Sequence, residues 1–219
     1  MDEAAAKSAI VAAGRRLGAR GLISAGEGNM SVRLDADRIL VTPSGRRKDE
    51  LEATDLVAVW IGHAERDARS ATGLSPSSDL AIHLAVYTAR PDIGAVVHAH
   101  LPASMALTLA GEIPDPTALP ETALLLPRLP YVAYGEMGSA ELADRIAAAL
   151  SQGPDPLPGA ALLERHGAVA VGPDLTTAVD RLELVEVLCR TWADALLLRA
   201  ARAGRLRRRV RRSRRSRGT

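Results

Sequence analysis

Phenylalanine is absent from this sequence, which has only two tryptophans and three tyrosines, so aromatic residues make up 2% of the chain. The chain is nevertheless 219 residues long, and 47% of them are hydrophobic. A domain of that size buries roughly 70% of the surface that its unfolded chain exposes. Its core must therefore be built from alanine, leucine and valine.

Cysteine is almost absent, since Cys189 is the single one in the chain. One cysteine excludes an internal disulfide scaffold and a zinc site made of thiolates, so we expect a reducing, cytoplasmic location. The opening residues MDEAAAKSAI lack the basic region and apolar run of a signal peptide. No stretch approaches 18 uninterrupted apolar residues, so we expect no membrane span.

Acidic residues are absent from positions 205–217, which hold nine arginines. Removing these nine charges from the net charge of +2 leaves −7 for residues 1–204. A net negative charge on residues 1–204 disfavours binding to nucleic acid. We therefore expect no nucleic-acid partner beyond weak contacts of the arginine-rich segment. We predict one domain over residues 1–204 and a disordered tail over 205–219, because clustered arginines repel one another and cannot form a core.

Helical and strand-like patterns alternate along the rest of the chain. Helical spacing of apolar residues predicts helices over 3–20, 80–90, 102–110, 139–150 and 174–203. Short apolar runs predict strands over 29–34, 38–42, 55–61, 93–100, 160–163 and 168–171. Ser77 or Ser78 is the expected N-cap of the second helix. The class is therefore α/β, with a sheet covered by helices.

His98 and His100 are the sharpest chemical signal in the sequence. Alternate residues of a strand share one face, so both imidazoles project together and form half of a metal site. The same pair also fits hydrogen-bonded strand histidines without any metal. His166, in a tight turn between two apolar runs, is the best third ligand. We expect His83 to lie in the core or behind the site, and His63 to lie on the surface.

Asp79 follows two serines at the start of a predicted helix. An acidic residue there is favoured by the helix dipole alone, and this interpretation stays open. Free backbone N–H groups and the hydroxyls of Ser77 and Ser78 also make such a helix start an anion site. The segments 26–29 and 42–45 read as turns, and together with the two serines they would supply clustered donors for a phosphate.

Five motifs in order resemble the class II aldolase and adducin N-terminal family, in particular its fuculose-phosphate aldolase branch. They are GNMSVR (28–33), ILVTPSG (39–45), SPSSD (75–79), VVHAH (96–100) and ERHGAVAVG (164–172). The resemblance runs from about residue 3 to 201. It implies a three-layer α/β/α sandwich with a central, mainly antiparallel sheet, and a homotetramer with active sites at subunit boundaries.

The resemblance also implies roles for individual residues. His98, His100 and His166 match the metal-binding histidines, and Asp79 matches the acid/base carboxylate that also touches the metal. The metal implied is Zn²⁺, or another divalent ion such as Mn²⁺ or Co²⁺. The phosphate of a small phosphorylated sugar would bind a larger set: Gly28, Asn29, Ser44, Gly45, Ser77 and Ser78.

The reaction implied is cleavage of a ketose 1-phosphate, such as fuculose 1-phosphate or a related deoxyketose phosphate, to dihydroxyacetone phosphate and a small aldehyde. The aldolases usually carry glutamate where this chain has Asp79, whereas related pentulose-5-phosphate 4-epimerases carry aspartate. An epimerase or a methylthioribulose-1-phosphate dehydratase of the same superfamily is therefore an alternative. A non-enzymatic, adducin-like interaction module is the alternative from a different class. The role of Glu121 stays open.

Overall fold

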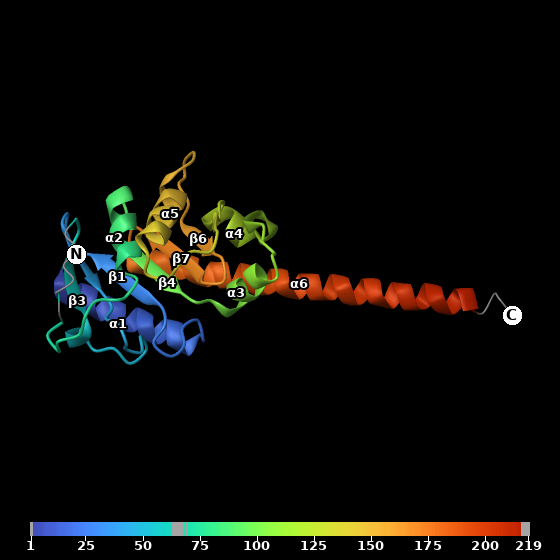
Figure 1. Ribbon diagram of the computed structural model, residues 1–219, viewed down its shortest axis with the longest axis horizontal. Helices are drawn as coiled ribbons and strands as arrows, with labels where there is room; N and C mark the ends of the chain where they lie inside the picture. Colours follow the sequence, from blue (N-terminus) through green and yellow to red (C-terminus); the bar gives the residue numbers. More distant parts are fainter. Residues whose placement is uncertain (1, 63–67, 69, 216–219) are drawn as a thin grey trace.

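The fold is organised around one seven-stranded sheet (Figure 1), and the computed structural model describes residues 2–62, 68 and 70–215. The strand order is β3-β2-β1-β4-β7-β6-β5, with β5 parallel to β6 and the other neighbours antiparallel. The sheet is thus mixed but mainly antiparallel, as the family resemblance predicts. Its strands are β1 (Asn29–Arg33), β2 (Arg38–Val41), β3 (Val57–Trp60), β4 (Ala95–Ala99), β5 (Tyr131–Val132), β6 (Ala160–Leu163) and β7 (Gly167–Gly172).

Helices cover both faces of this sheet. The helices are α1 (Glu3–Ala19), α2 (Leu80–Ala89), α3 (Pro102–Leu109), α4 (Pro120–Leu125), α5 (Ala140–Ser151) and α6 (Leu175–Arg215). Val96 packs in an apolar cluster with residues of α2 and α5, whereas its neighbour Val97 packs in a second cluster with residues of α1, α3 and α6. Since successive strand residues point to opposite faces, these two clusters define three layers. The α/β/α sandwich is therefore confirmed.

The strands and helices follow the sequence pattern closely. β4 and β7 are buried along their whole length, as expected for strands covered on both faces. Ser139 caps α5, its hydroxyl accepting a hydrogen bond from the backbone N–H of Leu142 at 3.2 Å. Within the described residues, no helix is both long enough and apolar enough to cross a membrane.

Two expected helix boundaries are wrong. Asp79, and not Ser77 or Ser78, is the N-cap residue of α2. Helix α6 continues to Arg215 instead of ending near Ala203, and Figure 1 shows its C-terminal part standing clear of the body. Leucine and arginine are good helix formers and no proline interrupts residues 175–215, so one glycine at position 204 does not end the helix. The segment 205–215 thus has a helical backbone where we expected disorder, and the domain boundary at 204 stays a prediction.

The proline-rich segment 113–130, which the sequence pattern leaves unassigned, contains two short elements. These are a 3₁₀ turn over Pro116–Ala118 and the six-residue helix α4. Both begin at a proline, whose fixed φ suits the first turn of a helix. Another 3₁₀ turn, Ala53–Asp55, precedes β3. His63, expected on the surface, lies outside the described residues.

Candidate metal centre and active site

Three histidines meet at one end of the central strands, as predicted. His98 lies in β4, His100 follows that strand, and His166 lies in the turn between β6 and β7. The antiparallel pairing of β4 with β7 brings this turn to the end of β4. The ring centroids are 5.1, 4.8 and 4.7 Å apart, and one ligand atom from each ring lies within 4.8 Å of the others.

The hydrogen bonding of these rings leaves nitrogen atoms that suit a metal ion. Nδ1 of His98 lies 3.0 Å from the carbonyl oxygen of Ala168 and donates its hydrogen there, so Nε2 carries the lone pair. That Nε2 atom and both ring nitrogens of His166 are buried and have no hydrogen-bond partner in the described part of the chain. Buried polar atoms normally find partners, because leaving them unpaired is costly. A divalent cation bound between the rings would satisfy Nε2 of His98 and one ring nitrogen of His166.

The surroundings of His98 and His166 favour the neutral form of these two imidazoles. Burial holds the pKa of His98 well below its usual value, and the neighbouring His166 and His100 rings lower it further. Burial is also the main cause that lowers the pKa of His166, followed by His100, while Asp79 acts in the opposite direction. Neutral imidazole is the form that binds metals, so the two rings are ready to bind without first losing a proton.

Glu27 orients the imidazole of His100, a role that the sequence pattern does not indicate. Its Oε2 atom lies 3.0 Å from Nδ1 of His100. Its other carboxylate oxygen accepts hydrogen bonds from the backbone N–H and the hydroxyl of Ser24, both at 2.8 Å. A carboxylate that holds the far nitrogen of a ligating histidine fixes its tautomer and raises its basicity. The signal in the sequence was an acidic residue between two glycines, which is too common to be diagnostic.

Gly167 allows the turn that carries His166 to approach β4. Its φ of +97° is unfavourable for other residues, and a Cβ atom there would lie 2.1 Å from the carbonyl oxygen of Ala99. Gly28 has the same role at the start of β1, with a φ of +70° and a Cβ position 2.9 Å from the carbonyl oxygen of His98. Both glycines let other segments pack directly on the backbone of the histidine strand.

Asp79 does not cap its helix. Its side chain makes no capping hydrogen bond, although the residue occupies the N-cap position of α2. Instead, Oδ2 of Asp79 accepts a hydrogen bond of 2.9 Å from Nδ2 of Asn29. The group of ligand atoms within 4.8 Å consists of the three histidines alone in the described residues, so a direct Asp79–metal bond stays a prediction. Asp79 is close enough to oppose the lowering of the His166 pKa.

A buried chain of polar groups holds the Asp79–Asn29 pair. Oδ1 of Asn29 lies 2.6 Å from Nε2 of His83, and Nδ1 of His83 lies 2.6 Å from the hydroxyl of Ser31. Since an amide oxygen only accepts, Nε2 of His83 carries the hydrogen and Nδ1 accepts one from Ser31. Burial lowers the pKa of His83 to about 4, which keeps this ring neutral. His83 therefore lies behind the site, as we expected, and fixes which way the Asn29 amide points.

The three segments predicted to bind phosphate are joined to one another. The backbone N–H of Ser44 donates to the carbonyl of Ser75 at 3.0 Å, and that of Ser77 donates to the carbonyl of Thr42 at 3.1 Å. Thr42 also exchanges backbone and side-chain hydrogen bonds with Met30, next to Asn29. Ser44, Gly45 and Ser78 are exposed, whereas Gly28, Asn29 and Ser77 are buried. The predicted phosphate residues thus form one connected loop cluster beside Asp79.

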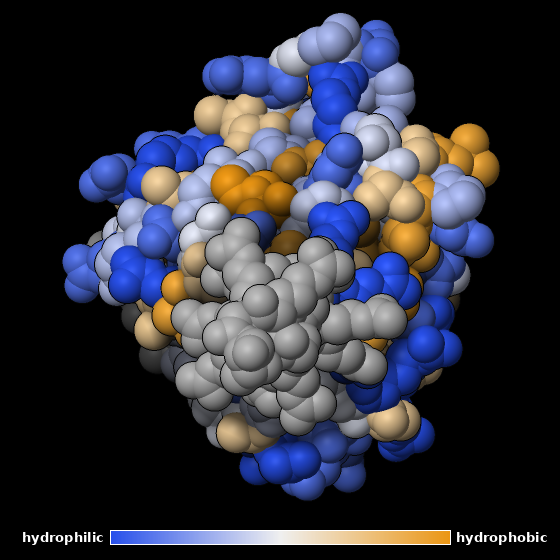
Figure 2. All heavy atoms as spheres, turned by 90° about the vertical axis from the view of Figure 1, so that its right-hand side faces the viewer, coloured by the Kyte–Doolittle hydropathy of each residue, from blue (hydrophilic) through white to orange (hydrophobic). Residues whose placement is uncertain are grey.

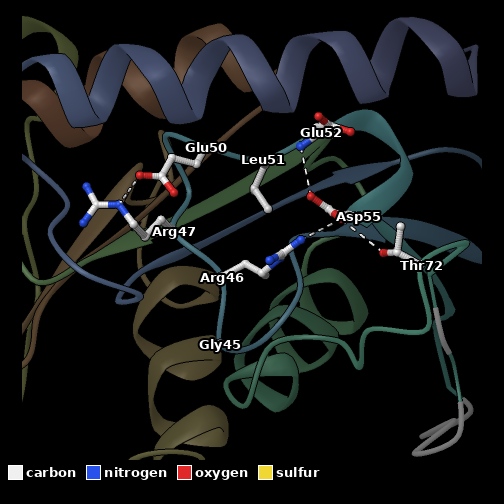
Figure 3. Close-up of a pocket in the computed structure, with 8 residues that line it drawn as sticks. All are labelled: Gly45, Arg46, Arg47, Glu50, Leu51, Glu52, Asp55 and Thr72. Carbon is white, nitrogen blue, oxygen red and sulfur yellow. Dashed lines mark hydrogen bonds and ion pairs between the residues drawn. The ribbon is translucent and has the colours of Figure 1, made fainter.

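A cavity of about 360 Å³ lies beside this loop cluster and not around the histidines. Figure 3 shows its lining side chains, among them Arg46, which points toward Asp55, and Arg47, which points toward Glu50. Gly45 is the one residue shared by the cavity lining and the predicted phosphate set. The cavity therefore adjoins the predicted phosphate site, but Asp79 and the three histidines do not line it.

Comparisons with known proteins agree with this geometry. Residues 8–193 match the model of the class II aldolase and adducin N-terminal domain. A methylthioribulose-1-phosphate dehydratase of Acidiphilium cryptum is 36% identical over 82% of this chain and 85% of its own length. A 3-oxo-tetronate 4-phosphate decarboxylase of Haemophilus influenzae is 30% identical over 85% of this chain and 86% of its own.

The structural comparison points the same way. The crystal structure of an L-fuculose-1-phosphate aldolase from Thermus thermophilus superposes with a TM-score of 0.76 and 29% identity, covering 90% of this chain and 97% of that one. The three relatives are named for different reactions, so they share a scaffold and not one chemistry. The match over residues 8–193 and the shared fold show that this chain belongs to the class II aldolase and adducin N-terminal family.

Proposed function

We propose that this chain is a divalent-metal-dependent lyase that cleaves a ketose 1-phosphate, such as fuculose 1-phosphate or a related deoxyketose phosphate, to dihydroxyacetone phosphate and a small aldehyde. The observation that carries the proposal is the histidine triad. One ligand atom of each ring lies within 4.8 Å of the others, and the buried ring nitrogens of His98 and His166 include atoms without a partner in the described residues. An interaction module has no need for such a triad.

The residues fit the chemistry of breaking a carbon–carbon bond next to a carbonyl. In the cleavage, the C4 hydroxyl gives its proton to the carboxylate of Asp79, C4 becomes the aldehyde carbonyl, and the electron pair of the C3–C4 bond passes to C3 and the C2 carbonyl. Asp79 then delivers a proton to C3, which completes dihydroxyacetone phosphate. A divalent ion held by His98, His100 and His166, most simply Zn²⁺, supplies a Lewis acid for the negative charge on the substrate oxygens.

The loop cluster at Gly28, Asn29, Ser44, Gly45, Ser77 and Ser78 would hold the phosphate. Anchoring the non-reacting end of the substrate places C3 beside Asp79 and uses binding energy to orient the reacting bond. Asn29 belongs to both parts of the site, because its amide donates to Asp79 while its backbone lies in the cluster. Phosphate binding and proton transfer are therefore mechanically linked.

Methylthioribulose-1-phosphate dehydration is the second candidate, favoured by the relative of that name at 36% identity. It would use the same histidines, the same phosphate loops and a proton transfer next to the carbonyl. The two reactions differ in whether the substrate loses an aldehyde or a water molecule. Product analysis therefore separates them directly.

The test is an assay of the purified, metal-loaded protein against fuculose 1-phosphate, 5-deoxyribulose 1-phosphate and methylthioribulose 1-phosphate. Dihydroxyacetone phosphate is detected by its coupled reduction with NADH, and dehydrated products are detected by mass spectrometry. Formation of dihydroxyacetone phosphate that stops on chelation supports the aldolase. Loss of water without aldehyde supports the dehydratase, and turnover that is unaffected by removing the metal contradicts both.

His98→Ala tests the metal centre independently of the substrate. We expect wild-type protein to hold about one divalent metal per chain and the variant to lose most of it, because two histidines remain where a catalytic zinc site uses three protein ligands. Elemental analysis of dialysed protein gives the result. Unchanged metal content in the variant would contradict the assignment of the triad.

We also propose that the chain assembles as a homotetramer. Figure 2 shows exposed apolar side chains on the end of the molecule from which α6 projects. Helices α3 and α4 and the segment between them expose Leu109, Ile113, Leu124 and Leu125. Grouped exposed apolar residues of this kind are typical of protein interfaces. Light scattering coupled to size-exclusion chromatography measures the mass, and a monomer would contradict the proposal.

A further inference from the structure

Three consecutive cations, Arg46, Arg47 and Lys48, follow the Ser44-Gly45 turn of the predicted phosphate cluster. Figure 3 shows that the side chains of the two arginines point toward Asp55 and Glu50. Nη2 of Arg46 lies 3.7 Å from Asp55. Arg47 pairs with Asp49 at 3.0 Å and with Glu50 at 2.8 Å. Both arginine side chains are about half exposed, so neither supplies an unpaired charge to the site.

Lys48 behaves in the opposite way. It is only 3% exposed, and its Nζ atom donates hydrogen bonds of 2.7 Å to the carbonyl oxygens of Gly26 and Arg46. In the described part of the chain it forms no ion pair. Its own backbone is fixed as well, because its carbonyl oxygen packs directly against Gly14 of α1. A Cβ atom on Gly14 would lie only 1.9 Å from that oxygen. Lys48 is thus a firmly placed, buried ammonium group without a counterion in contact.

Such a group is expensive unless something compensates its charge. A buried charge loses its hydration, and carbonyl dipoles repay only part of that loss. Burial accordingly lowers the pKa of Lys48, while the more distant carboxylates of Asp79 and Glu27 act to raise it. These two carboxylates belong to the site, so the Lys48 charge acts on the same small volume that holds Asp79.

The hydrogen bonds of Lys48 also connect two of the three phosphate segments. The Gly26 carbonyl lies in the loop that leads to Gly28 and Asn29, and the Arg46 carbonyl directly follows Ser44 and Gly45. The remaining predicted phosphate donors are backbone N–H groups, an amide and hydroxyls, none of which carries a charge. A phosphate monoester has nearly two negative charges near pH 7, and a cluster of neutral donors alone leaves them unbalanced.

We propose that Lys48 is the buried cation of the phosphate subsite, which spaces the loops 26–29 and 42–46 and supplies the positive charge that attracts a phosphate monoester. This inference rests on the proposed function, because it concerns the same substrate phosphate. Lys48 acts as a positioning residue through these loops and through its charge, and it takes no part in proton transfer.

A role confined to holding the loops is the competing explanation, and Lys48→Gln separates the two. Glutamine keeps a hydrogen-bond donor for one of the two carbonyls but carries no charge. Arg47→Gln is the matched control, because it removes one cation from the neighbouring position on the exposed side of the same segment. Melting temperature and metal content of both variants verify that the fold and the histidine site persist.

Binding of inorganic phosphate to the metal-loaded proteins, measured by titration calorimetry, is the first experiment. We expect Lys48→Gln to weaken phosphate binding by about tenfold or more, because the attraction of a buried charge across a short, poorly screened distance is lost. We expect Arg47→Gln to leave phosphate binding unchanged. The metal content of all three proteins should be equal. Equal phosphate affinity in Lys48→Gln and wild type would overturn the inference while leaving the proposed lyase intact.

Kinetics with the phosphorylated ketose that the wild type turns over gives the second readout. We expect KM to rise by about tenfold or more in Lys48→Gln with kcat within a few-fold of wild type, because substrate anchoring and not proton transfer is changed. A lower kcat at unchanged KM would overturn the role.

If Lys48→Gln does not fold, Lys48→Met provides the uncharged variant, and equal phosphate affinity there overturns the inference too. Wild-type protein that binds no phosphate at all would overturn the subsite and the proposed substrate class together.

Discussion

Replacing Asp79 with asparagine separates its catalytic role from its structural one. Within the described residues, the carboxylate accepts one hydrogen bond, from Nδ2 of Asn29 at 2.9 Å, and it makes no capping hydrogen bond to the helix N-terminus. An asparagine side chain can offer its own oxygen to the same donor. The structure therefore predicts that the variant keeps the contact and loses only its charge.

The expected effect on stability is small. A charge-assisted hydrogen bond becomes a neutral one, which costs about 1 kcal/mol, and the smaller desolvation of a neutral amide at this 8% exposed position offsets part of that cost. For a protein of this size such a change lowers the melting temperature by roughly 2–4 °C. Calorimetry or thermal melting monitored by circular dichroism measures it.

The expected effect on catalysis is large. General acid–base catalysis supplies about 10² to 10⁴ in rate, so kcat of Asp79→Asn should fall at least about a hundredfold. That loss corresponds to about 2.7 kcal/mol or more in the activation barrier. Metal content should persist, because His98, His100 and His166 remain. Steady-state kinetics on metal-loaded protein, with Asp79→Glu as the companion variant that retains a carboxylate, gives the comparison.

A wild-type rate in Asp79→Asn would refute the acid/base assignment outright. A loss of metal together with activity would instead make Asp79 chiefly a ligand, against the mechanism described here. Retained lyase activity in Asp79→Glu would support a shared mechanism with the aldolases that carry glutamate at the matching place.

Three further predictions concern other parts of the chain. Gly167→Ala should lower the free energy of unfolding by roughly 2–4 kcal/mol, because the φ of this residue is +97° and the new Cβ would lie 2.1 Å from the carbonyl oxygen of Ala99. Chemical denaturation measures this change, and an unchanged midpoint would disprove the close approach. The Cys189 thiol is buried, and burial raises its pKa to about 12. Ellman's reagent at pH 8 should therefore react with it only after unfolding. Rapid reaction of the native protein would contradict the buried position of this thiol. Truncation after Gly204 should leave kcat within about twofold, since the arginine-rich end of α6 stands clear of the body; a large loss of turnover would mean that this end reaches an active site.

The sequence predicted those parts of the site that depend on local periodicity. The i, i+2 spacing of His98 and His100 and the apolar runs on both sides of His166 led us to expect the three imidazoles in one group. The structure brings them together, while their role as metal ligands stays a prediction. Contacts between distant segments could not be predicted in this way. Nothing near Glu27 or Lys48 indicates that one would hold His100 and the other would be buried, because both roles depend on loops that meet only in the folded chain.

Helix boundaries show the same division. Ser139 caps a helix that has a clear apolar face, so the start of this helix agrees with the predicted range 139–150. Asp79 instead occupies the cap position of α2 without using its side chain for capping. The end of α6 was not predictable either, since arginine repulsion argues for disorder while arginine helix propensity argues for continuation.

The order in which the ligands occur along the chain has a consequence for biosynthesis. His98 and His100 are made early, but His166 follows His100 by 66 residues and depends on β6 and β7 for its position. A growing chain that ends before this turn therefore holds two ligands and no complete triad. Because metal binding of this kind is coupled to folding, the ion proposed for this triad would bind only after His166 has been made and placed by β6 and β7. Metal content in a purified sample would thus give a lower bound on the fraction of molecules that have completed the fold.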